Sequence, residues 1–274
     1  MKEDTKLVHL GRGPSNFEGT VNLPVYRAST ILSADMDSYI HRFDGDKNLT
    51  DITYGARGTQ NLRALGDAIA DLEGGYGTIV TTSGLSAISV ALGALVSAGD
   101  HILISDSVYG PTRTFCDQVL SRYGVSTEYY SPDIGDAITE LIQENTRLVF
   151  MEAPGSLTFE MQDIPVITRA AKEKGVLTVM DNTWATPVFF RPLEHGVDIS
   201  IQAGTKYIAG HSDLVIGMVT SSNEATHRIL VSHAHNLGDA ASPDDCYLAL
   251  RGLRTLSVRL CRQQETTLKV ATWL

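Results

Sequence analysis

The sequence predicts an α/β fold built around a mostly parallel β-sheet, and three observations lead to it. Short segments rich in apolar and β-branched residues alternate with segments whose apolar residues recur at helical spacing. The expected strands are apolar almost without interruption, as in strands that helices cover on both faces. Small and polar residues follow several of these strands directly. Alternation of this kind is typical of a parallel sheet with helical crossovers.

The alternating region begins near residue 60. Leu62, Leu65, Ile69 and Leu72 recur at helical spacing, and the Gly74-Gly75 pair predicts the end of that helix. Strands are then expected at Thr78–Thr82, His101–Ser105, Ser126–Tyr130, Leu148–Glu152, Leu177–Asp181, Asp198–Gln202 and Leu214–Thr220. Helices are expected between them at Leu85–Val96, Thr112–Tyr123, Ile134–Gln143 and Ile164–Lys174. The long connection 182–197 breaks this rhythm, and long ordered loops in such folds often carry sites.

The pattern divides the chain into three parts. Residues 1–58 lack apolar periodicity and are expected to form an extended N-terminal arm, which leads into a large domain at 59–252. From Ala225 onward the pattern is mainly helical, with an apolar stripe at Leu250, Leu253, Leu256 and Leu260 that continues into Leu268 and Val270. The final residues are apolar and lack a helix cap, so residues 253–274 are expected to be the start of a truncated C-terminal domain.

Composition excludes several classes of function. With 22 Lys and Arg against 32 Asp and Glu, the formal net charge is −10, which argues against nucleic-acid binding and against docking on anionic membranes. No secretory signal or membrane-spanning run is recognisable, so a cytoplasmic location is expected. Cys116, Cys246 and Cys261 have no metal-ligand spacing and are expected to be small buried side chains. His233 and His235 lie two apart in a helical segment and do not share a face, so no metal site is expected.

Three segments could carry chemistry. Thr81–Leu85 joins a strand to a helix, where backbone N–H groups can hold a phosphate, although such small-residue turns are often only structural. Asp181 ends a buried strand, where α/β sheets place ligands, although alone it could equally cap a loop. Lys206 follows another strand end among small residues, and a lysine in such a pocket can act as a nucleophile or base.

Together, a strand-end Lys, a strand-end Asp and a helix N-terminus are the parts of a site for pyridoxal phosphate. Their order resembles the Cys/Met-metabolism family of pyridoxal-phosphate enzymes, and the resemblance covers essentially the whole chain. The matching segments are Tyr54–Thr59, Ser83–Ala87, Ser107–Thr112, Glu152–Ser156, Asp181–Pro187, Ile201–Asp213 and Arg251–Leu260. Trp184 and Gln202 are more similar to the bacterial β-lyase branch than to the γ-enzymes.

The resemblance implies a role for each matching residue. Lys206 would carry the cofactor covalently and later shuttle the α-proton of the substrate. Asp181 would pair with the pyridinium nitrogen, and Tyr109 would stack on the ring. The alternative for Tyr109 is ordinary packing of an aromatic side chain.

The phosphate would be held by the backbone amides of Gly84 and Leu85 together with Thr205. Tyr54 would reach the phosphate of a neighbouring subunit and assist proton transfer, unless it is an ordinary packing aromatic; the alternative for Thr205 is a turn residue.

The chain departs from the family pattern at two phosphate-binding positions. The family Arg two residues after Tyr54 is Ala56 here, with Arg57 one step later, so Arg57 is a candidate replacement or else a solvated surface charge. A family Ser is replaced by Ala203.

The implied fold is the large domain of the pyridoxal-phosphate-dependent transferases, the aspartate aminotransferase superfamily or fold type I. The implied activity is β-elimination of L-cystathionine to homocysteine, pyruvate and ammonia in methionine biosynthesis, by a homodimer or homotetramer. The alternatives are γ-synthase or γ-lyase chemistry on the same scaffold, and an inactive fragment that only binds the cofactor. Family members continue into a domain that supplies an Arg for the substrate carboxylate, so poor turnover is expected of these 274 residues alone.

Overall fold

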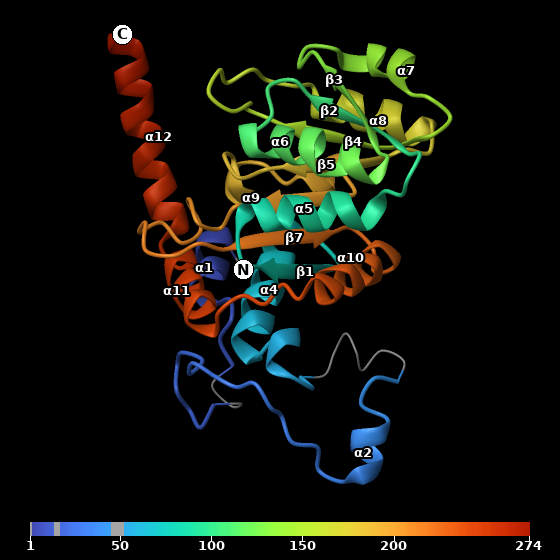
Figure 1. Cartoon of the computed structure of the whole chain (residues 1–274). Coiled ribbons are helices and arrows are strands. Elements are labelled where there is room, and N and C mark those ends of the chain that lie inside the picture. Colours follow the sequence, from blue (N-terminus) through green and yellow to red (C-terminus); the bar gives the residue numbers. More distant parts are fainter. Residues whose placement is uncertain (1, 14–16, 45–51) are drawn as a thin grey trace.

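A computed structural model describes residues 2–13, 17–44 and 52–274. Seven strands form one sheet in the order β1-β7-β6-β5-β4-β2-β3 (Figure 1). Their bounds are β1 Gly77–Thr81, β2 His101–Ser105, β3 Ser126–Tyr130, β4 Thr146–Glu152, β5 Leu177–Asp181, β6 Ile199–Gln202 and β7 Gly217–Ser221. Each coincides with a predicted strand to within a few residues, so the predicted α/β class is confirmed.

The strand directions place the carboxyl ends of most strands at one edge of the sheet. β2, β3, β4, β5 and β6 pair in parallel, whereas β7 is antiparallel to both β6 and β1. β1 consequently runs in the same direction as β6. The carboxyl ends of β1, β2, β4, β5 and β6 therefore share one edge, which is where ligands bind in open α/β sheets.

Side chains alternate between two buried faces of the sheet. In β4, Leu148 and Phe150 pack into the cluster that contains helix α5 (Gly84–Leu95), while Val149 and Met151 pack on the opposite side with helix α8 (Ile164–Glu173). Near the β1 edge, that opposite side is covered instead by helices α4 (Gln60–Glu73) and α11 (Pro243–Leu253). Burial on both faces explains why the strands are apolar without a break, and the result is a three-layer sandwich.

The helices on either side of the strands are α4 Gln60–Glu73, α5 Gly84–Leu95, α6 Gly110–Gln118, α7 Ile138–Leu141, α8 Ile164–Glu173, α9 Thr186–Phe189, α10 Glu224–Leu237 and α11 Pro243–Leu253. The helices predicted at Thr112–Tyr123 and Ile134–Gln143 are shorter than expected. The first stops at Gln118, and the 3-10 helix Leu120–Tyr123 follows it. In the second, Gly135 has φ +54°, so a 3-10 turn precedes the four-residue α7.

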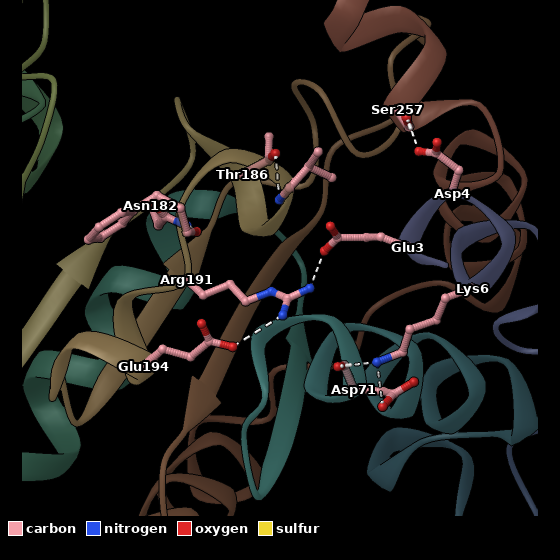
Figure 2. A network of polar contacts seen from close by, with 11 residues as sticks. Glu3, Asp4, Lys6, Asp71, Asn182, Thr186, Arg191, Glu194 and Ser257 are labelled. Carbon is pink, nitrogen blue, oxygen red and sulfur yellow. Dashed lines mark hydrogen bonds and ion pairs between the residues drawn. The ribbon is translucent and has the colours of Figure 1, made fainter. Parts of the chain in front are cut away.

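The expectation of an extended segment is wrong at the beginning of the chain. Helix α1, Glu3–His9, packs on the large domain with Leu7 only 1% exposed. Figure 2 shows its polar contacts: Lys6 Nζ lies 2.8 Å from Asp71 Oδ1, Glu3 pairs with Arg191, and Asp4 accepts from Ser257. A seven-residue helix that buries one leucine has no apolar periodicity to detect, although that leucine joins the core cluster of α4 and α11.

The next part of the arm is also attached to the domain, up to about residue 27. Leu23 is buried, and the Asn61 side chain accepts from the backbone N–H of Tyr26 at 2.8 Å and donates to the Pro24 carbonyl at 3.0 Å. Farther along, the arm carries the short helix α2, Met36–Ile40, which has no buried residue and lies away from the sheet in Figure 1.

The predicted apolar stripe of the C-terminal region is confirmed in its first half. Leu250, Leu253, Leu256 and Leu260 are buried against α4 and its neighbours. The last helix, α12 Leu256–Trp273, then leaves the domain, as Figure 1 shows, and its remaining side chains are mostly exposed. Cys261 lies on this exposed part, so its predicted burial is wrong, although Cys116 and Cys246 are buried. Within the described parts of the chain, no helix combines the length and apolar composition that a membrane crossing requires.

A carboxyl group is enclosed between α4 and β6. Glu73 Oε1 accepts from Ser200 Oγ at 3.0 Å and from Gln202 Nε2 at 2.9 Å, while Oε2 has no hydrogen-bond partner among the described residues. Burial raises the pKa of Glu73 from its ordinary value of 4.5 to about 7. The folded state therefore keeps a proton that the unfolded state releases between these two values.

Replacing Glu73 by Gln should make the stability less dependent on pH. The contribution of this carboxyl to the free energy of unfolding is present in acid and is lost as the pH rises through about 7. The free energy of unfolding should change by roughly 3 kcal/mol between pH 4 and pH 9 for this reason. Urea unfolding of the cofactor-free protein across that range should show a smaller decline for Glu73→Gln than for the unsubstituted chain. Glu140→Gln, an exposed position on α7, is the matched control, and equal slopes for all three proteins would contradict the prediction.

Candidate active site

The three segments singled out in the sequence meet at the carboxyl edge of the sheet. Asp181 Oδ1 accepts from the Thr183 N–H at 3.0 Å, and Thr183 Oγ1 accepts from the Ala203 N–H at 2.7 Å. Ala203 in turn lies against Gly84, where an added Cβ would be 2.6 Å from the Ala203 Cβ. The ends of β1, β5 and β6 are thus held together by direct contacts.

The start of α5 has the features of an anion site. Ser83 caps the helix by accepting the Ser86 N–H at 3.0 Å, whereas Gly84 and Leu85 occupy the first turn, whose N–H groups have no partner within a helix. Their amides point out of the positive end of a twelve-residue helix. Gly217 allows β7 to approach this turn closely, because a Cβ there would lie 2.1 Å from the Ser83 carbonyl oxygen.

A carboxylate that no sequence pattern singles out also contacts this turn. Asp239, in the connection between α10 and α11, accepts from the Thr82 N–H at 2.9 Å and from the Ser86 hydroxyl. It therefore fixes the flanks of the turn without using the Gly84 and Leu85 amides. Asp239 is far from the site in sequence, and no strand end or motif marks it.

Asp181 is a buried carboxylate without a cation beside it. Its side chain is 8% exposed, and burial raises its pKa above the ordinary range. Oδ1 is used by Thr183, while Oδ2 has no hydrogen bond within the described residues, and no Lys, Arg or His pairs with the carboxylate there. An unpaired buried carboxylate is costly, which indicates that its partner is a group outside the chain.

Lys206 lies four residues after the end of β6 and is exposed. Its backbone N–H donates to the Ala203 carbonyl at 3.1 Å, which places it in the turn that contacts Gly84. The Thr205 hydroxyl is engaged with the backbone of Ile216, donating to the carbonyl at 3.1 Å and accepting the N–H at 3.0 Å. Thr205 would have to release the Ile216 carbonyl to donate to a phosphate.

Tyr109 follows β2 at the beginning of α6, and its side chain is 45% exposed. Its backbone N–H donates to Glu152 Oε2 at 2.8 Å, which connects it to the end of β4. Glu152 therefore lies at the same edge, although the sequence analysis assigns it no role. The signal was nevertheless available, since it ends a buried strand as Asp181 does.

Tyr54 and Arg57 are not part of this cluster within one chain. Tyr54 is exposed and forms an isolated bridge with Thr30. Arg57 lies over the Phe43 ring, 4.5 Å from its centre, and lines a cavity of about 110 Å³ with residues of β1 and α10. Apart from Arg57, the predicted site residues do not line that cavity, whereas Asp239, which contacts the start of α5, does.

The residues at the edge fit pyridoxal phosphate. The buried Asp181 carboxylate lacks a cation that a protonated ring nitrogen would provide, and the α5 amides are free for a phosphate. Lys206 supplies an accessible amine on the turn that contacts Gly84 through Ala203. The described residues contain no group of three or more His, Cys, Asp or Glu side chains placed to hold a metal ion.

Several known proteins are similar to this chain over nearly its whole length. A protein of Rhizobium johnstonii, provisionally named a cystathionine beta-lyase, is 49% identical over 99% of this chain and 67% of its own length. The cystathionine beta-lyase of Salmonella typhimurium is 41% identical, over 99% of this chain and 69% of its own. The L-alanine/L-glutamate racemase of Wolbachia pipientis is also 41% identical, over 100% and 69%.

A solved structure gives the same fold. The crystal structure of cystathionine gamma synthase from Xanthomonas oryzae matches with a TM-score of 0.84 and 31% identity, covering 94% of this chain and 64% of that one. The present chain thus spans about two thirds of the length of the proteins it matches. The model of the Cys/Met metabolism PLP-dependent enzymes matches residues 4–274. The chain therefore belongs to the family of pyridoxal-phosphate-dependent enzymes of Cys/Met metabolism.

Proposed function

We propose that the chain carries the catalytic site of a carbon–sulfur β-lyase that cleaves L-cystathionine to homocysteine, pyruvate and ammonia. The observation that carries the proposal is the contact between three segments, which brings the Lys206 turn, the unpaired Asp181 carboxylate and the start of α5 to one edge of the sheet. The names of several relatives at about 40% identity support the choice of reaction. A cytoplasmic location is proposed on the same basis.

Each residue has a defined task in this reaction. When bound, pyridoxal phosphate supplies an aldehyde for the substrate amine and a ring that stabilises negative charge at the α-carbon. Asp181 holds a proton on the ring nitrogen, and burial strengthens this ion pair. Tyr109, Gly84 and Leu85 fix the orientation of the ring and the phosphate.

Lys206 performs the proton transfer. Its amine would hold the cofactor covalently and, in its free form, would accept the α-proton of the substrate. The Cβ–S bond then breaks and its electron pair leaves on sulfur, which gains a proton and departs as homocysteine. The remaining three-carbon fragment takes up water and is released as pyruvate and ammonia.

Product analysis distinguishes this reaction from the other chemistries of the relatives. Lys206 and Asp181 serve all of them, so the residues described here do not discriminate. With L-cystathionine, β-elimination gives pyruvate, whereas γ-elimination gives 2-oxobutyrate. With L-alanine, a racemase gives the D-enantiomer. Pyruvate as the main product supports the proposal; 2-oxobutyrate, or D-alanine formation at a higher rate, would replace it.

We also propose that the protein forms a homodimer or homotetramer and that Arg57 contributes to the phosphate site of a neighbouring subunit. Within one chain Arg57 lines a cavity with residues of β1 and α10 that Lys206 does not line. A guanidinium close to a doubly negative phosphate is favourable.

Arg57→Ala should therefore weaken pyridoxal phosphate binding by about tenfold, which corresponds to one charge-assisted contact. Ala56→Arg, which restores the family residue, is the matched variant, and equilibrium dialysis of the cofactor gives the affinities. Unchanged affinity in Arg57→Ala together with tighter binding in Ala56→Arg would show that Arg57 does not replace the family ligand.

A further inference from the structure

Two carboxyl groups stand next to each other at the edge of the sheet. Glu152 and Asp181 are the last residues of β4 and β5, and they are paired partners in the register of these parallel strands. Each residue is 8% exposed. Among the described residues, neither has an ion pair with a Lys, Arg or His.

Glu152 uses both of its oxygens to connect neighbouring loops. Oε2 accepts the backbone N–H of Tyr109 at 2.8 Å, and Oε1 accepts from the Ser156 hydroxyl at 2.6 Å. The Ser156 N–H also donates to the Ser107 carbonyl at 2.8 Å. The loop after β4 and the turn that presents Tyr109 are therefore fixed to each other, with Glu152 between them.

The neighbouring Asp181 makes a second negative charge unfavourable. Burial, followed by the charge of Asp181, raises the pKa of Glu152 to about 7. Asp181 is the titratable side chain that acts on Glu152; Tyr109 and Ser156 face it with a backbone amide and a hydroxyl, and Gln162 donates to its backbone carbonyl. Two adjacent buried carboxyls share a proton rather than ionise together. The hydrogen bonds from Tyr109 and Ser156 lower the pKa of Glu152 and so oppose these two effects. The proposed role of Asp181 beside the ring nitrogen requires the negative charge there, which leaves the shared proton to Glu152.

We propose that Glu152 is a positioning residue that acts as a neutral hydrogen-bonding group: it holds the Tyr109 backbone in place beside the cofactor ring and leaves the negative charge to Asp181. This inference rests on the proposed function, in which Tyr109 and Asp181 contact the ring. It assigns Glu152 no direct contact with substrate or cofactor.

Two substitutions separate hydrogen bonding from charge. Glu152→Gln keeps the length of the side chain and an oxygen that accepts from the Tyr109 N–H. Its NH₂ group donates to the Ser156 hydroxyl, as a protonated Oε1 of a neutral Glu152 would, but the substitution removes the possibility of a charge. Glu152→Asp keeps the carboxyl but shortens the side chain by one methylene, which withdraws it from the Tyr109 N–H. A neutral positioning role thus predicts that Gln is tolerated and Asp is not.

The measurement is the affinity of the cofactor-free protein for pyridoxal phosphate, followed by the absorbance and circular dichroism of the bound cofactor. Glu152→Gln should bind within about threefold of the unsubstituted protein, whereas Glu152→Asp should bind about tenfold more weakly and show reduced cofactor dichroism. Melting temperatures of the cofactor-free variants show whether both fold.

A double-mutant cycle tests whether Glu152 acts through Tyr109. In a Tyr109→Ala background, Glu152→Asp should weaken pyridoxal phosphate binding less than twofold, because the tyrosine ring that Glu152 positions is absent. Impairment of Glu152→Gln equal to that of Glu152→Asp would overturn the inference, as would a full tenfold loss in the Tyr109→Ala background. If the unsubstituted protein bound no pyridoxal phosphate, the proposed function itself would be contradicted. If the unsubstituted protein and both Glu152 variants bound it equally well, only this inference would be overturned.

Discussion

Replacing Lys206 by alanine is expected to lower pyruvate formation from L-cystathionine by at least about a thousandfold, the largest effect of any single substitution in this protein. The loss has two parts. The covalent hold on the cofactor disappears, and so does the base that accepts the α-proton. Lys206 is exposed in a turn that contacts Gly84 through Ala203, and no other lysine of the described ranges follows a strand at this edge.

The same variant should still bind pyridoxal phosphate, because Asp181 and the α5 amides remain. Its bound cofactor should lack the colour of the covalently held form. Lys172→Ala, an exposed position on α8, is the control and should retain both colour and turnover. Near-normal turnover in Lys206→Ala would remove Lys206 from the site, whatever the behaviour of the control.

The second large effect is expected for Asp181→Asn. The variant should keep much of its cofactor affinity but lose about a hundredfold in turnover, because a neutral amide cannot hold a proton on the ring nitrogen. The Thr183 N–H can still donate to the amide oxygen, so the local backbone should be preserved. Steady-state kinetics should show the loss in kcat rather than in KM.

Asp136→Asn, an exposed aspartate after β3, controls for the removal of one negative charge from the protein. A turnover of Asp181→Asn close to that of the control would show that Asp181 only caps its loop. Loss of folding would be visible as a lower melting temperature. It would differ from the expected outcome, in which the folded variant binds cofactor but turns over slowly.

The sheet was predictable because of where its strands lie. Residues such as Phe150 and Val149 face opposite sides of β4, yet both are buried, so the strand reads as a continuous apolar run. Helix α1 could not be found in this way. Leu7 is its one buried residue, and its docking depends on partners such as Asp71 and Arg191 that are distant in the sequence.

The site was predictable where chemistry follows a strand end. Lys206, Asp181 and Gly84 come directly after strands or within a short turn, so the sheet topology necessarily brings them to one edge. Glu152 satisfies the same criterion and could have been selected. Asp239 could not, because it reaches the start of α5 from the connection between two helices, and only the folded chain brings them together.

Tyr54 and Arg57 show a different limit. The resemblance to a family assigned them to the phosphate of a neighbouring subunit, and their positions in a single chain lie outside the Lys206 cluster. A role across a subunit interface, if it exists, would leave no contact within a single chain that could reveal it. Their assignment remains a prediction that the cofactor affinities of Arg57→Ala and Ala56→Arg test.

The most direct test of the site is reduction of the cofactor-loaded protein with borohydride, followed by proteolysis and mass mapping of the labelled peptide. Reduction makes the bond between the cofactor and its lysine permanent, so the label identifies that residue without depending on turnover. We expect a single phosphopyridoxyl group on Lys206. A label on Lys172, Lys174 or any other lysine, with Lys206 unmodified, would contradict the assignment of the active site.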